Sequence, residues 1–197
     1  MNADNQQERL ETTGWITGFV DGEGCFSISI QKNPKTSSGW QVFPEFVVTQ
    51  GAKSLKALQI LQDFFGCGKI HVNRRHDDHR ENLYRFCVRS IEDLKSKIIP
   101  FFKSHPLRTA KQADFEKFCD GLAVMERRDH LQEQGRLKIA AICQTMNRRR
   151  KPKFLESSET VCQTSRKAGK KIQSELCSDA ERTAEMPVPV AQVISCS

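Results

Sequence analysis

The sequence predicts a mixed domain of the α+β class, within the broader α/β group, in which one antiparallel sheet carries its helices on one face. Two observations indicate this fold. Four short segments alternate apolar and polar residues and group into two hairpins, and helical patterns stand before, between and after these hairpins. The resulting order, αββαββα, favours a single sheet that is covered on one side.

The first helical segment carries an unusual glycine pattern. Gly14, Gly18 and Gly22 recur at every fourth residue and therefore share one helix face. Each glycine costs roughly 1 kcal/mol of helix propensity relative to alanine, so three on one face indicate that another backbone approaches closely. The pattern predicts a symmetric homodimer in which two copies of this short helix cross at the two-fold axis.

Two carboxylates, Asp21 and Glu23, end this helix just before the first strand. They lie where the helix macrodipole is negative, and a neighbouring two-fold axis brings their two copies together. Clustered carboxylates require cations, and hard oxygen ligands favour Mg²⁺. We therefore predict a Mg²⁺ site at Asp21, Gly22 and Glu23, with Glu23 as the principal ligand and Asp21 expected to steady the helix end more than to bind the metal. Taken alone, Asp21–Gly24 also fits a plain glycine-rich turn between a helix and a strand.

The first predicted hairpin pairs Gly24–Lys32 with a strand that runs from Trp40 to about Gln50. Pro44 lies within the second of these strands. Because proline has no N–H to donate to a neighbouring strand, it predicts an edge position or a bulge there. An amphipathic helix over Ser54–Phe65 follows and ends at a glycine pair.

The second predicted hairpin begins with Lys69–Arg74, whose apolar residues Ile70 and Val72 are expected to face inward. A charged loop leads to the fourth strand. A helix over Ile91–Phe102 comes next, and residues 125–148 are predicted to form two consecutive helices. The two hairpins and the intervening helix together make the predicted sheet layer.

The uncovered face of this sheet is expected to be polar and cationic, with Glu45 as an acidic exception. Strand alternation and the adjoining turn assign to it Ser27, Ser29, Gln31, Asn33, Gln41, His71, Asn73, Arg85 and Arg89. A β-ribbon of this kind suits a groove of duplex DNA. An ordinary solvated sheet face is the alternative interpretation.

The overall composition agrees with a polyanionic partner, because the 197-residue chain carries a net charge of +7. No apolar run approaches the ~20 residues that span a bilayer, and the N-terminus lacks the apolar core of a secretory signal. The eight cysteines are scattered without a C-x-x-C pair, which argues against a zinc ribbon or a disulfide framework. We expect an intracellular, reduced protein with no membrane partner.

The stretch Gly18-Phe19-Val20-Asp21-Gly22-Glu23-Gly24 resembles the signature of LAGLIDADG homing endonucleases of the type with one motif per chain. Val48-Thr49-Gln50 is similar to the end of that family's second strand, and Leu107–Phe115 is similar to the segment opening a later helix. The resemblance covers about Thr12 to Arg150. It implies a saddle-shaped sheet and an intron-encoded, mobile gene.

The resemblance also implies an activity, namely hydrolysis of both strands of a long, pseudo-palindromic DNA site by a Mg²⁺-dependent homodimer. Glu23 would bind the metal, Gln50 would orient the attacking water, and Lys111 or Arg108 would offset charge at the phosphate. A protein that binds DNA or intron RNA without cutting, such as a maturase or a repressor, is the alternative. The acid at Glu23 favours the nuclease. A purely structural dimer is a third possibility, against which the basic strand faces argue.

Two further expectations concern location and domain limits. The resemblance is compatible with the bacterial cytoplasm and with an organelle, either chloroplast or mitochondrion, wherever the target genome lies. Residues 1–151 are predicted to form the endonuclease domain with its closing helices. Residues 152–197 are rich in polar and charged residues, which predicts a disordered tail.

Overall fold

The computed structural model describes residues 3–73, 82–147 and 154. These residues belong to a compact unit, Met1–Leu155, whereas a second unit, Glu156–Ser197, lies outside the described part. The predicted tail therefore lies outside it too, except for Phe154. None of the helices within the described residues combines the length and the apolar character needed to cross a bilayer.

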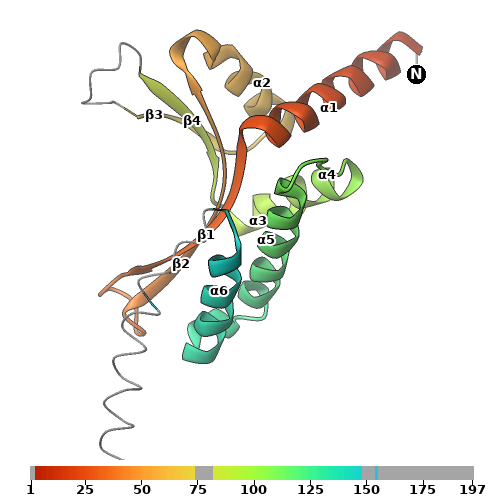
Figure 1. The fold of residues 1–197 in the computed structure, drawn as a ribbon. Coiled ribbons are helices and arrows are strands. Elements are labelled where there is room, and N and C mark those ends of the chain that lie inside the picture. Colours follow the sequence, from red (N-terminus) through yellow and green to blue (C-terminus); the bar gives the residue numbers. More distant parts are fainter. Residues whose placement is uncertain (1–2, 74–81, 148–153, 155–197) are drawn as a thin grey trace, which may run out of the picture. The chain divides into compact units, whose positions relative to one another are not determined.

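Helix α1 (Ala3–Glu23) is longer than the short helix expected from the sequence. Its extra turns contain Ala, Gln, Glu, Arg and Leu, which are good helix formers. Ile16 and Val20 are fully buried on one side of the helix, while Leu10 and Trp15 are exposed. The packed half of α1 is therefore its C-terminal half, which leads directly into the sheet (Figure 1).

The sheet has four antiparallel strands in the order β1-β2-β4-β3. They are β1 (Gly24–Lys32), β2 (Trp40–Gly51), β3 (Lys69–Asn73) and β4 (Leu83–Val88). The two hairpins lie side by side, so β2 and β4 are central. This arrangement confirms the predicted hairpins and the single antiparallel sheet.

Pro44 occupies the part of β2 that has a strand on one side. It lies opposite Ile28 of β1, and pairing with β4 begins at Phe46. A residue without an N–H is tolerated at such a position because no second strand requires that donor. The expected edge environment of Pro44 is confirmed although β2 is a central strand.

Helix α2 (Leu55–Phe65) follows a 3₁₀ turn, η1 (Ala52–Ser54), and ends at Gly66. Gly66 has φ +56°, a left-handed conformation that glycine adopts without strain. Its N–H donates to the Gln62 carbonyl at 2.9 Å, which closes the last turn. The helix therefore ends where the glycine pair predicts.

The segment predicted as one helix over Ile91–Phe102 contains a wider turn. It consists of α3 (Ile91–Asp93), the π-helical turn η2 (Leu94–Ile98) and α4 (Ile99–Ser104). Pro100 follows the π turn. In a regular α-helix, Pro100 would have no N–H for the Ser96 carbonyl and its ring would crowd that oxygen, which accounts for the wider turn.

The prediction of two consecutive helices over residues 125–148 is wrong for the first of them. Helix α5 (Lys111–Glu126) ends there, the 3₁₀ turn η3 (Asp129–Leu131) follows, and α6 (Glu133–Thr145) is the second helix. Arg128 adopts a left-handed φ of +61° and interrupts the helix. A Cβ at Gly135 would collide with the Asp129 carbonyl, so this glycine allows α6 to pack directly against η3.

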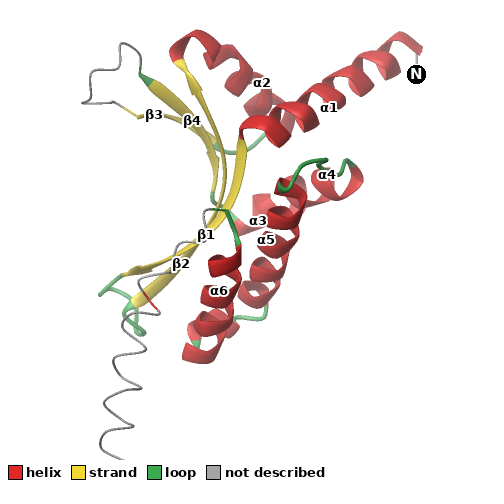
Figure 2. Cartoon of the chain, viewed as in Figure 1, coloured by secondary structure: helices red, strands yellow, loops and turns green. Residues whose placement is uncertain are grey.

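The helices lie on one face of the bent sheet, and the other face is uncovered (Figures 1 and 2). The covered face is strongly aromatic. Phe26 stands at its centre, and its ring lies 5.0 to 5.5 Å from four other phenylalanine rings, those of Phe46, Phe102, Phe115 and Phe118. This cluster joins β1 and β2 to α4 and α5 in one core.

Two residues differ from the expected burial. Val72 was expected to face the core but is 51% exposed, because β3 is the outer strand and only Ile70, nearer its start, packs against the core. Phe154 lies beyond the predicted domain boundary at residue 151, yet it is buried against Trp40, with ring centroids 5.1 Å apart. The compact unit therefore uses at least one residue of the predicted tail.

Candidate active site at the end of helix α1

The helix-to-strand junction after Glu23 depends on Gly24. This residue is buried, and a Cβ built on it would lie 2.6 Å from Val20 Cγ1 and 2.7 Å from the Val20 carbonyl oxygen. Only glycine lets β1 leave the helix so closely. The junction therefore places the last residues of α1 at the end of the sheet, where Glu23 is exposed.

Asp21 holds the segment that precedes α5. Its carboxylate accepts hydrogen bonds from the Arg108 amide at 2.8 Å, the Thr109 amide at 3.2 Å and the Thr109 hydroxyl at 2.5 Å. Desolvation would raise the pKa of Asp21, but these hydrogen bonds outweigh it and leave the pKa below its usual value. The oxygens of Asp21 are thus already engaged, which favours a positioning role over the predicted metal contact.

Lys111, the first residue of α5, reaches back to the end of α1. Its Nζ donates to the Val20 carbonyl at 2.9 Å, one of the last carbonyls of α1, which lack helical donors. Burial lowers the pKa of Lys111, while the charges of Asp21, Cys25 and Glu23 partly oppose that change. The ammonium group is therefore held at the end of α1, where its charge interacts with that of Glu23.

Arg108 lies differently from Lys111, although the sequence left the choice between them open. It contributes its backbone amide to Asp21, and its side chain is exposed. The structure therefore ties Lys111, and not the Arg108 guanidinium, to the end of α1.

Glu23 and Gly22 offer hard oxygen donors that suit Mg²⁺ or a similar cation. Within the described part of the chain, no hydrogen bond engages the Glu23 carboxylate, and Gly22 belongs to the last helical turn, whose carbonyls lack intrahelical donors. In that same part, no three His, Cys, Asp or Glu side chains of one chain gather into a metal cage. Mg²⁺ usually keeps several waters and is bound through only one or two carboxylates, so Glu23 with the Gly22 carbonyl fits such an ion without a cage of side chains.

Gln50 lies at the same end of the sheet. Gly24 pairs with Val48, so Gln50 stands two residues beyond this pair, where α1 joins β1. It lies opposite Tyr84 of β4 and is half-buried. The fold thus brings three predicted catalytic residues, Glu23, Gln50 and Lys111, to one end of the sheet from three separate elements.

Residues 16–122 match the family model described as LAGLIDADG endonuclease. The chain belongs to this family. It is 33% identical over 140 residues to "Probable intron-encoded endonuclease 3" of Neurospora crassa, a match that covers 70% of this chain and 25% of that protein. The chain therefore spans about a quarter of the length of that curated relative.

Solved structures resemble this LAGLIDADG chain over most of its described fold. The homing endonuclease I-TnaI is 39% identical, with a TM-score of 0.66, and the match covers 76% of this chain and 97% of that one. I-SmaMI "bound to uncleaved DNA target in the presence of Calcium ions" is 31% identical, with a TM-score of 0.64, over 72% of this chain and 47% of that one. These likenesses confirm the predicted fold class.

The glycine face of α1 is open in this LAGLIDADG chain. A Cβ built at Gly14, Gly18 or Gly22 would meet nothing within 4 Å. The chain's own packing therefore does not require these glycines, whereas Gly24 on the same segment is required by Val20. Contact between this face and a second copy of α1 stays a prediction, and the open space around the three glycines permits it.

The uncovered sheet face carries the polar residues that the sequence assigns to it. Register places Ser27 opposite Glu45, and Arg85 lies between Thr49 on β2 and His71 on β3. Five predicted residues are exposed and four are half-buried; the exposed ones are Ser29, Gln31, His71, Asn73 and Arg89, and the half-buried ones are Ser27, Asn33, Gln41 and Arg85. These residues are thus accessible to solvent, as expected of an uncovered face, and their contact with DNA stays a prediction.

Glu45 is a feature of this face that sequence reasoning did not assign to the site. Its two carboxylate oxygens accept from Arg85 Nη2 at 3.2 Å and Arg89 Nε at 2.6 Å. The hydrogen bond and charge of Glu45 raise the pKa of Arg89. No sequence pattern could reveal this network, since it depends on the register between β2 and β4.

Proposed function

We propose that this LAGLIDADG chain is a site-specific DNA endonuclease that acts as a homodimer and uses a divalent cation, with Mg²⁺ as the expected ion. The observation that carries the proposal is the placement of two groups at the end of α1: the Glu23 carboxylate, which accepts no hydrogen bond from the described residues, and the Lys111 ammonium, whose charge interacts with it. An exposed acid next to a cation, at the rim of a polar sheet face, is suited to phosphodiester hydrolysis. The family and the relatives named as endonucleases support this interpretation.

Each residue at the junction has a distinct part in this mechanism. Glu23 and the Gly22 carbonyl would hold the cation, which lowers the pKa of a bound water and polarises the phosphate when it is present. Gln50 would orient the attacking water through its amide. Lys111, fixed by the Val20 carbonyl, would face charge that develops on the phosphate.

Duplex DNA is the partner that best fits the uncovered face. The row of polar side chains on β1 and β2 suits hydrogen bonds to base edges, and Arg85 and Arg89 add positive charge. I-SmaMI, a structural relative, is named as bound to uncleaved DNA in the presence of calcium ions. We extend to this chain both a DNA partner and a need for divalent ions.

Dimerisation follows from the open glycine face of α1. Two copies of α1 that cross there would place two Glu23 side chains near one axis, one for each DNA strand. Such a dimer imposes its two-fold symmetry on the target, which is then pseudo-palindromic. We place the protein in the compartment that holds its target genome, bacterial cytoplasm or organelle.

The decisive experiment incubates the purified full-length chain and Mg²⁺ with duplex DNA that spans the uninterrupted version of its own insertion locus. A double-strand break at the insertion point is the expected result. An EDTA-treated reaction serves as the control and should leave the duplex intact. If the protein binds the duplex but leaves it unbroken at every Mg²⁺ concentration, the result would favour a non-cutting binder. We would then test intron RNA as its partner.

A further inference from the structure

The uncovered sheet face contains an acid in a place where phosphate repulsion would disfavour one. Glu45 projects from the middle of β2, opposite Ser27 of β1. Its side chain is only 17% exposed, whereas the side chains of Arg85 and Arg89 are 36% and 58% exposed. The acid therefore lies beneath two cations, and the outer surface of the group is cationic.

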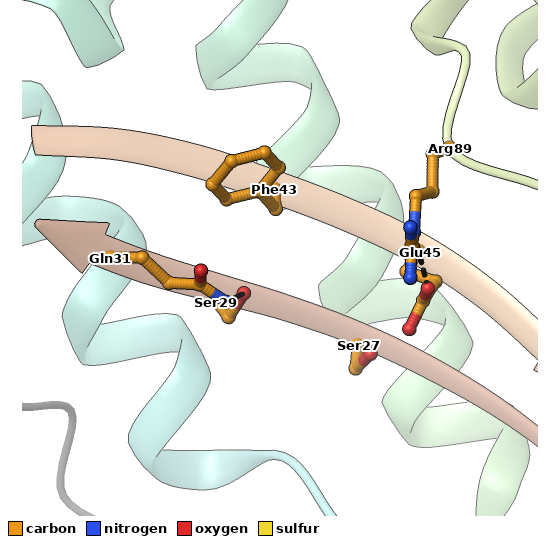
Figure 3. A pocket seen from close by; sticks show the side chains of 6 residues that line it. All are labelled: Ser27, Ser29, Gln31, Phe43, Glu45 and Arg89. Atoms are coloured by element: carbon orange, nitrogen blue, oxygen red, sulfur yellow. Dashed lines mark hydrogen bonds and ion pairs between the residues drawn. The ribbon is translucent and has the colours of Figure 1, made fainter. Parts of the chain in front are cut away.

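The geometry of the group leaves a defined part of Arg89 available. Glu45 engages Nε of Arg89, so the two terminal nitrogens at the far end of the guanidinium are not used by this ion pair. The side chain reaches over Glu45 beside a hollow lined by Ser27, Ser29, Gln31 and Phe43 (Figure 3). Because the Arg89 side chain is 58% exposed, this planar fork with its two parallel donors is accessible to a partner on the sheet face.

Stability alone does not account for this arrangement. Exposed ion pairs contribute little to folding, because solvent screens the charges and ordering long side chains costs entropy. The same pairs do restrict the arginine side chains to one geometry. Restricting a flexible donor before binding reduces the ordering cost that is otherwise incurred when the partner arrives.

We propose that Glu45 is a positioning residue for base recognition and that it holds Arg89 ready to read a guanine in the major groove. Guanine presents two acceptors there, O6 and N7, which match the two free donors of the fork. Glu45 is only 17% exposed and each of its oxygens already accepts from an arginine, so we assign the base contact to Arg89 and not to Glu45. This inference rests on the proposed DNA binding and adds a preferred base pair in each half-site.

The test selects bound duplexes from a pool of randomised double-stranded DNA, with the full-length chain and three variants. R89K keeps the charge but loses the fork, and E45Q keeps the shape but loses the ion pair. Glu92→Gln makes the same chemical change as E45Q at an exposed position on α3, on the helical side of the sheet. Melting curves for each protein show whether the variants fold.

The wild-type chain should enrich guanine at one position of each half-site, and R89K should lose about 10-fold of that preference. E45Q should weaken the preference at that same position by roughly 3- to 10-fold. Its affinity for unrelated DNA should not fall, because a negative charge has been removed. Glu92→Gln should match the wild type. If E45Q does not fold, R89K still tests the guanine contact.

Two outcomes would overturn the roles assigned to Glu45 and Arg89 and leave the proposed DNA binding intact. One is an unchanged guanine preference in E45Q or in R89K. The other is an E45Q protein that binds all duplexes more tightly to the same degree, which would mean that Glu45 acts only through its charge. A different result, in which the wild-type chain retains no duplex, would overturn the proposed DNA binding itself.

Discussion

The two faces of the sheet use the same strands for opposite purposes. One face buries phenylalanine rings against α4 and α5, with Phe26 and Phe46 fully buried. The other face carries serines, glutamines and the Glu45–Arg85–Arg89 group, which remain in contact with solvent. Because successive side chains of a strand point to opposite sides, Phe26 and Ser27 belong to different environments although they are neighbours in the chain.

This division separates stability from chemistry. Burial of apolar area stabilises the domain from the covered side, so the uncovered side and its rim at Glu23 are free to carry polar groups. The rim shows the same division on a smaller scale: Asp21 has its oxygens engaged by three donor groups, whereas Glu23, two residues later, is exposed. Four substitutions test whether the division holds.

The largest effect is expected for Glu23→Gln at the rim. Loss of the carboxylate should reduce Mg²⁺-dependent cleavage by about 10⁴-fold, because metal stabilisation of the reacting phosphate is worth several kcal/mol. DNA binding and thermal stability should stay at wild-type values. Single-turnover cleavage assays measure the first effect, and Glu8→Gln, on an exposed part of the same helix, is the matched control. Unchanged cleavage in the Glu23 variant would remove this residue from the catalytic centre.

Phe26→Ala, on the covered face, should have the opposite effect to Glu23→Gln, because it should lower the stability of the domain. Truncation of this fully buried ring should lower the free energy of unfolding by about 3–5 kcal/mol, since it leaves a cavity among four phenylalanine rings. Phe43→Ala removes the same ring from the uncovered face and should cost clearly less. Urea unfolding of both variants makes the comparison. Equal losses would show that the two faces do not differ as we describe.

The glycine face of α1 supplies the third test. Gly18→Leu should fold as well as the wild type, because its Cβ meets nothing within 4 Å in one chain, yet it should weaken dimerisation by about 100-fold, equivalent to roughly 2.7 kcal/mol. Sedimentation equilibrium measures the dissociation constant. Gln59→Leu adds the same side chain to an exposed position of α2 and should leave assembly unchanged. A Gly18 variant that dimerises normally would contradict the crossing of two α1 helices.

The smallest effect is expected for Asp21→Ala, which should lower the free energy of unfolding by about 1 kcal/mol at pH 7, as the loss of a helix cap does. The pKa of Asp21 is lowered in the folded state. Its stabilising effect is therefore fully present above the unfolded pKa of about 4 and is lost as the pH falls through the folded value. Denaturant unfolding at pH 7 and at about pH 3 should show a difference that shrinks in acid. A difference that persists at low pH would mean that the carboxylate charge is not what stabilises the segment.

Local patterns in the sequence determined the hairpins, the uncovered polar face and the glycine–carboxylate stretch. Alternation with a period of two and glycines at every fourth residue are properties of consecutive residues, so they are visible without a fold. Tertiary structure alone decided which of these residues meet. The contacts of Asp21 with Thr109, of Lys111 with Val20 and of Glu45 with Arg89 join residues 88, 91 and 44 positions apart.

The same distinction accounts for the errors in the predicted elements. The exposure of Val72 depends on which strand lies at the sheet edge, and the left-handed φ of Arg128, where α5 has ended, is not indicated by the apolar pattern of residues 125–148. Strand order, strand register and helix docking arise from contacts between distant segments, and a sequence pattern of a few residues carries no record of them. The chain therefore specifies its chemical groups locally, and only the packed domain brings Lys111 to the end of the helix that carries Glu23.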